Sequence, residues 1–84
     1  MKHTKLFWRI LGKTCIDSAL SQRDILGRKR DKSIVWWQHE FRGRYYYALK
    51  EKGMESYKGV SRETDRDHTT IMHSLRIYRK RHGL

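Results

Sequence analysis

The chain has 84 residues and a formal net charge of +11, because 20 lysines and arginines face nine acidic residues. A chain of this length fits one small domain and buries only about 60–65% of the surface of its unfolded form, which argues against a deep substrate pocket. Unrelieved positive charge disfavours folding through self-repulsion, so a polyanion is the expected partner and nucleic acid is the first candidate.

The amino-terminal residues are the place to look for a targeting or membrane signal. Lys2 and Lys5 flank the start of an apolar run, Leu6-Phe7-Trp8, but Arg9 interrupts it and no long apolar segment follows. Cys15 stands alone, which excludes an internal disulfide and a cysteine-based zinc site. We therefore expect a cytoplasmic, nucleoid-associated protein with no membrane partner, no metal and no cofactor.

The chain has no proline and no linker rich in glycine and serine, which predicts a single all-α domain over residues 1–84, a small bundle of about five helices. Apolar residues at steps of three and four predict a first helix over residues 4–17: Leu6, Phe7, Ile10, Leu11 and Thr14. Ser21 and Asp24 have the spacing of a capping box, which predicts a short second helix through Ile25 and Leu26 that ends at Gly27.

A basic loop, Arg28-Lys29-Arg30-Asp31-Lys32, precedes the predicted third helix. Ser33 is its expected N-cap, and the helix should run from Ile34 to about Lys52 with Gly53 as its stop. Helical spacing predicts its core stripe: Ile34, Trp37, Phe41, Tyr45, Ala48 and Leu49. Other aromatics fall off this stripe and form either a second packing face against the amino-terminal helix or a partner surface: Trp36, Tyr46 and Tyr47.

The last third of the chain predicts a helix-turn-helix. Residues 56–62 form a short helix of about seven residues, although Gly59 lowers the helix propensity there. Residues 64–67 make the turn, and the last helix runs from about His68 to Arg81. Its core side should carry three residues: Ile71, Leu75 and Tyr78. A short helix, a tight turn and a longer helix with a polar start are the layout of that DNA-binding motif.

Short polar groups at the start of the last helix are candidate base readers. Asp67 can accept a hydrogen bond from a cytosine or adenine amino group, and His68 can bond to a base edge. Thr69 offers a hydroxyl and a methyl, and Arg66 can anchor on phosphate or read guanine. In the alternative interpretation, Asp67 only caps the helix and the threonines fill its first turn.

Further basic and polar residues are candidates for contacts with phosphates or the minor groove. A short basic run is a weak signal by itself, since such runs are often only solvated. Helix N-terminal amides attract phosphate, which adds Thr70 to the basic loop as a register-fixing group. The full set is Arg28, Lys29, Arg30, Lys32, Thr70, His73 and Arg76.

No constellation typical of catalysis occurs in the sequence. His39-Glu40 lacks the second histidine of a zinc-protease helix, because residue 43 is glycine. His68 and His73 are five residues apart, which places them on different faces of a helix and argues against a shared metal. We therefore do not expect an enzyme.

The run Arg66-Asp67-His68-Thr69-Thr70 and the residues after it resemble the signature of one known family. The DNA-binding domain (domain IV) of the bacterial replication initiator DnaA reads Arg-Asp-His-Ser/Thr-Thr-Val-Leu/Met-His-Ala at this place. Similarity extends from about Leu20 to Tyr78, strongest over residues 66–73 and moderate over residues 27–33. Residues 1–17 lie outside it and supply the chain's own first helix.

The resemblance implies a helix-turn-helix of the Trp-repressor-like superfamily, with the last helix in the major groove and base contacts from residues 66–69. It also implies that the basic loop enters the minor groove, with Arg30 as the minor-groove arginine and Lys32 on a phosphate. Asp31 departs from the family's serine, and Thr64-Asp65 replaces its Phe-Gly. The third-helix region is about four residues longer, near one helical turn.

The expected function is therefore sequence-specific binding of double-stranded DNA by a monomer, at sites resembling the initiator's binding box, to regulate replication or transcription. A stand-alone domain without an ATPase module resembles a phage or mobile-element regulator. Two alternatives stay open. One is a phage-encoded regulator that contacts the host initiator or polymerase, and the other is sequence-neutral binding of nucleic acid, RNA included.

Overall fold

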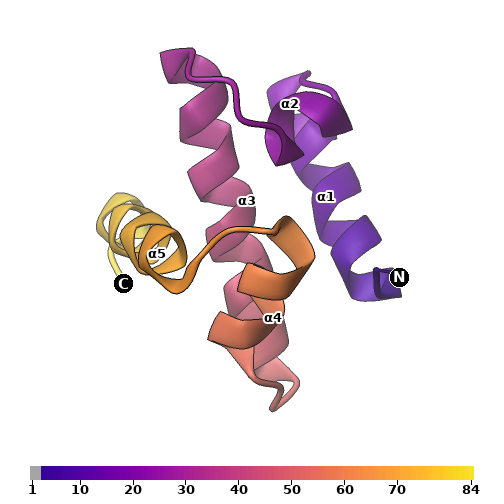
Figure 1. Cartoon of the computed structure of the whole chain (residues 1–84), viewed down its shortest axis with the longest axis vertical. Helices are drawn as coiled ribbons and strands as arrows, with labels where there is room; N and C mark the ends of the chain where they lie inside the picture. Colours follow the sequence, from indigo (N-terminus) through magenta and orange to yellow (C-terminus); the bar gives the residue numbers. More distant parts are fainter. Residues whose placement is uncertain (1–2) are drawn as a thin grey trace.

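A computed structural model describes residues 3–84, and over that range the chain is all-helical (Figure 1). The helices are α1 (Lys5–Ser18), α2 (Gln22–Leu26), α3 (Lys32–Glu51), α4 (Ser56–Thr64) and α5 (His68–His82). The predicted small bundle of about five helices is confirmed. Lys2, weighed above as part of a targeting signal, lies outside the described residues. Within residues 3–84, no helix combines the length and apolarity needed to cross a membrane.

The first two helices begin where their capping residues predict. Thr4 caps α1 by accepting a hydrogen bond from the Phe7 amide at 3.0 Å. Ser21 and Asp24 form the predicted capping box of α2, with each side chain accepting from the other residue's backbone amide. These side chains satisfy amides that have no partner inside a helix, so both boundaries are determined locally.

Helix α3 is the centre of the bundle, and every other helix contacts it. In Figure 1 it stands upright, with α1 and α2 along one side, α4 across its lower part and α5 seen nearly end-on at the other side. The Phe7 ring of α1 meets Phe41 and Tyr45 of α3 edge to face, at centroid distances of 5.5 and 5.4 Å. Aromatic pairs in this geometry add to the burial energy of the core.

The start of α3 corrects one prediction. The N-cap is Asp31 and not Ser33: the Asp31 carboxylate accepts hydrogen bonds from the Ser33 amide at 3.0 Å and the Ser33 hydroxyl at 2.6 Å. Ser33 is therefore inside the first turn, and the helix starts at Lys32. The acid inside the basic loop thus has a structural role, because it caps the central helix.

The predicted core stripe of α3 is confirmed for Phe41, Tyr45 and Leu49, which are buried. Tyr46, expected off the stripe, is also buried, with 6% of its surface exposed. It packs against Tyr57 of α4, with ring centroids 5.0 Å apart. Tyr47 is partly buried, with its ring centroid 5.7 Å from that of Tyr78 in α5. Trp36, in contrast, is 39% exposed.

Helices α4 and α5 form the helix-turn-helix. Helix α4 extends to Thr64, two residues beyond its predicted end. Gly59 is tolerated in this helix because it is buried against Leu49, where a larger side chain would not fit. Asp65 takes a left-handed conformation with φ of 54°, and the Arg66 amide closes the turn on the Ser61 carbonyl at 3.1 Å. The predicted core residues of α5 are buried (Ile71 and Leu75) or partly buried (Tyr78).

Candidate nucleic-acid interface

The first turn of α5 exposes the residues that the sequence nominates as base readers. Asp67 is the N-cap, and one of its carboxylate oxygens accepts a hydrogen bond from the Thr70 amide at 2.9 Å. That backbone hydrogen bond holds the pKa of Asp67 below its ordinary value, so the carboxylate is ionised at neutral pH and can accept hydrogen bonds. Its capping role is therefore established, and the exposed side chain is free to accept one more donor.

His68 and Thr69 follow the cap and are both exposed. The His68 ring lies beside Tyr57 of α4, with ring centroids 4.9 Å apart, which limits how the imidazole can turn. Thr69, His73 and Arg76 lie at steps of four and three, so these three exposed side chains share one face of α5. A continuous polar and basic face of this kind suits a helix that lies in a DNA groove.

Arg66 is brought to the same place but has an internal role. Its Nη2 donates to the Gly27 carbonyl at 2.6 Å and the Leu26 carbonyl at 3.3 Å, while Nη1 donates to the carbonyls of Thr64 and Asp65, both at 3.3 Å. The guanidinium therefore fastens the end of α2 to the turn of the helix-turn-helix. A base contact by these two nitrogens would require those bonds to break.

Gln38 of α3 orders the basic loop, and the sequence analysis missed it. Its side-chain amide nitrogen donates to three carbonyls between α2 and the basic loop, at 2.9 Å for Asp24, 3.2 Å for Gly27 and 3.4 Å for Lys29. Arg66 and Gln38 meet on the Gly27 carbonyl, so α3, the basic loop and the turn before α5 are held as one unit. No spacing in the sequence marks Gln38 or Arg42 as buried, because glutamine and arginine at helical spacing ordinarily form an exposed face.

The cations of the basic loop differ in how far they are compensated. Lys29 pairs with Asp24 at 2.8 Å, and Arg28 approaches Asp65 at 3.8 Å. Arg30 and Lys32 have no carboxylate within 4.0 Å among residues 3–84. These two exposed cations are therefore the ones most available to an external anion.

A hollow of about 290 Å³ lies between the basic loop, α3 and the start of α5, and we call it the Arg42 hollow. Positive groups dominate its wall, and no acidic residue lines it. Its lining includes five cationic residues and one threonine: Arg28, Lys29, Arg30, Arg42, Arg66 and Thr70. Four of the seven predicted phosphate ligands line this hollow, namely Arg28, Lys29, Arg30 and Thr70, while Lys32, His73 and Arg76 lie outside it.

His39 of α3, three residues before Arg42, faces α5, and both side chains meet at the Ser74 hydroxyl. Its Nδ1 lies 2.7 Å from the Ser74 hydroxyl, and its ring centroid is 5.2 Å from that of His73. Burial, together with the positive charge of Arg42, lowers the pKa of His39 to about 4, so the ring is neutral at pH 7. The residues described by the structure contain no group of three histidine, cysteine or acidic side chains placed to hold a metal ion.

Comparisons with known protein families, with curated proteins and with solved structures find no match for this chain.

Proposed function

We propose that this chain binds double-stranded DNA sequence-specifically, with α5 in the major groove and the basic loop in the adjacent minor groove. Asp67, His68 and Thr69 contact bases, and Arg30 enters the minor groove, as in the DnaA domain IV that the sequence resembles. Arg66 supports these contacts by fixing the turn. The biological role that fits this activity is regulation of replication or transcription.

One observation carries the proposal: the exposed first turn of α5 and the uncompensated end of the basic loop are tied into one unit by Arg66 and Gln38. Two reading elements in fixed relation can contact neighbouring grooves of one duplex without an ordering step on binding. At the start of α5, Asp67, His68 and Thr69 supply hydrogen-bond acceptors and donors for base edges. In the basic loop, Arg30 supplies a guanidinium group for a narrow minor groove.

The test is selection of bound duplexes from a random DNA pool by the full chain, with sequencing of the bound fraction. We expect one non-palindromic motif bound by a monomer, with an adenine- and thymine-rich flank where Arg30 lies. Failure to enrich any motif would overturn specific reading. Enrichment of a motif unlike the initiator's binding box would retain the proposal and remove only the specificity taken from the resemblance.

Sequence-neutral binding is the second candidate, because a net charge of +11 favours any polyanion. Competition distinguishes the two functions. The labelled selected duplex is displaced with three unlabelled competitors of the same length: the selected duplex, a scrambled duplex and RNA. If binding is specific, the selected duplex competes far better than the other two, whereas a charge-driven binder is displaced equally by all three.

A further inference from the structure

Two residues apart on α3 lie a buried acid and a buried base with opposite surroundings. Glu40 is 2% exposed and is compensated by Arg44, Arg81 and His82, at 3.2, 3.3 and 3.0 Å. Arg42 is 5% exposed, and no carboxylate lies within 4.0 Å of it in residues 3–84. A buried charge without a partner strongly destabilises the fold, so this arginine requires an explanation.

Within the part of the chain that the structure describes, the Arg42 side chain makes one hydrogen bond, from Nη1 to the Ser74 hydroxyl at 3.1 Å. Among residues 3–84, no buried side-chain nitrogen or oxygen lacks a hydrogen-bond partner. The remaining guanidinium donors of Arg42 are therefore the ones that reach solvent, and they do so in the hollow that this residue lines. A buried cation with open donors facing a cavity is arranged to receive an acceptor.

The neighbours of Arg42 concentrate positive charge there. Burial, with the charges of Arg66 and Arg28, lowers the pKa of Arg42 to about 10, so it remains protonated at neutral pH. Arg66 uses its Nη donors on backbone carbonyls, so it contributes charge to the hollow and few hydrogen bonds. Arg30, at the rim and without a carboxylate partner, is placed to close over a bound group.

We propose that the Arg42 hollow is a binding site for one phosphate-class oxyanion, with Arg42 as its buried ligand and Arg30 as its outer ligand. Guanidinium groups match this class because their paired N–H donors meet two oxygens of a tetrahedral anion at once. The anion is either one backbone phosphate of a bound DNA strand or free phosphate. The first source rests on the proposed function, and the second does not.

Free inorganic phosphate tests the site itself. In a titration of the full chain at constant ionic strength, we expect the Arg42 Nε–Hε NMR signal to shift and saturate with phosphate but not with chloride. Arg42→Met, which fills the space with an apolar side chain, should weaken phosphate binding at least tenfold, measured from the signal of Arg30. Lys5→Met, far from the hollow, should bind as the wild type does.

An unshifted Arg42 signal in the wild-type protein overturns the proposal without any variant, so a folding defect in Arg42→Met cannot hide the answer. Arg42→Lys adds a second reading, since it keeps the charge and removes the paired donors. If Arg42→Lys and Arg42→Met both bind phosphate as tightly as the wild type does, the binding is due to the general positive charge of the protein. That result would also overturn the proposed site.

Bound DNA tests the source. Each phosphate of the selected duplex is replaced in turn by a neutral methylphosphonate. We expect one position where the replacement costs the wild-type protein about tenfold in affinity and costs Arg42→Met nothing further, because the two changes remove the same contact. Equal losses in both proteins at every position leave free phosphate as the ligand. If no motif can be selected, the proposed function fails and the phosphate titration still decides the site.

Discussion

Asp67 shows how one side chain can hold a helix and remain available for recognition. Its carboxylate caps α5 on the Thr70 amide and is otherwise exposed beside His68 and Thr69. A capping acid is common, and on its own it says nothing about DNA. The capping role and the proposed reading role can be separated, because serine also caps a helix but has no charge to offer an amino group of a base.

We expect Asp67→Ser to keep the thermal stability close to that of the wild type and to change the selected DNA motif at one base pair. At that position the affinity for the original base should fall about tenfold. Asp67→Ala should lower the melting temperature as well, because the cap is lost. If both variants instead bind every duplex more tightly, removal of an acid is all that matters and the protein binds by charge.

His39 predicts how stability depends on pH. Its pKa in the folded protein is about 4, below the ordinary histidine value of 6.5, because of burial and the charge of Arg42. The unfolded chain therefore takes up this proton first, and stability decreases as the pH falls from about 6.5 to about 4. The loss should be at most about 3 kcal/mol, which corresponds to the difference between the two pKa values.

Urea unfolding at pH 7 and pH 4.5 measures this loss, and His39→Gln is the variant to compare because it can keep a hydrogen bond to Ser74. The variant should lose clearly less stability than the wild type between these two pH values. Four aspartates with lowered pKa values contribute stability that is lost only below about pH 4, so they act equally in both proteins. An identical pH dependence in the two proteins would contradict the role of His39.

At the scale of helices, the crossing of α3 and α5 depends on Gly43. A Cβ atom at this position would lie 2.2 Å from Cγ of the Tyr78 ring. Gly43→Ala should therefore lower the free energy of unfolding by about 1–3 kcal/mol, even though alanine favours a helix over glycine. Gly12→Ala is the matched control, since nothing lies within 4 Å of the added Cβ on α1.

For that control we expect a gain of up to about 1 kcal/mol, from helix propensity alone. Urea denaturation of the two variants gives both numbers. Equal effects in the two glycine variants would mean that α5 is not packed against α3 as closely as the structure has it.

The helices could be predicted from sequence where local chemistry determines them, as at Ser21 and Asp24. The start of α3 was predicted wrongly because two neighbouring residues, Asp31 and Ser33, can both cap a helix. The structure shows that Asp31 is the N-cap. Tyr46 was placed outside the core because a single stripe assumes that one side of a helix is covered. Helix α3 is covered by all four other helices, so its buried surface extends round to Tyr46.

The candidate site divides in the same way. The position of Asp67, His68 and Thr69 at the exposed start of α5 could be predicted because they are adjacent in the chain, while their contacts with bases stay a prediction. The clamp between Arg66 and Gly27 joins residues 39 positions apart, and no spacing rule connects them. The burial of Arg42 without a carboxylate partner likewise depends on how α2, α3 and α5 pack together. The composition therefore shows the net positive charge but not the place where an anion could bind.

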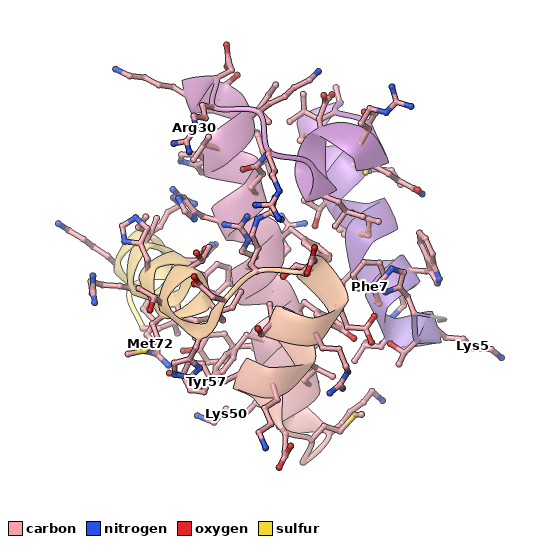
Figure 2. All side chains as sticks on the ribbon, viewed as in Figure 1. Lys5, Phe7, Arg30, Lys50, Tyr57 and Met72 are labelled. Atoms are coloured by element: carbon pink, nitrogen blue, oxygen red, sulfur yellow. The ribbon has the colours of Figure 1, made fainter. Side chains whose placement is uncertain are left out.

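For the whole molecule, DNA binding can depend either on the total net charge of +11 or on where the charged residues lie on the surface. Figure 2 shows Arg30 near the start of α3, Lys50 near its other end and Lys5 on the far side of the bundle. The bundle measures 32 × 29 × 22 Å along its principal axes, so its opposite sides are about three Debye lengths apart at 0.1 M salt. A duplex docked on α5 and the basic loop should therefore gain little from Lys5.

This separation predicts a salt dependence that differs among single-charge variants. For the wild type, a plot of log Kobs against log salt concentration should be linear and steep, since each phosphate contact releases condensed counterions. Arg30→Gln and Arg76→Gln should each reduce the slope by about 1, because each removes one such contact. Lys5→Gln makes the same change in net charge and should leave the slope unaltered. Fluorescence anisotropy at several salt concentrations measures all four slopes, and a common decrease in the three variants would show that total charge, and not the face formed by α5 and the basic loop, determines binding.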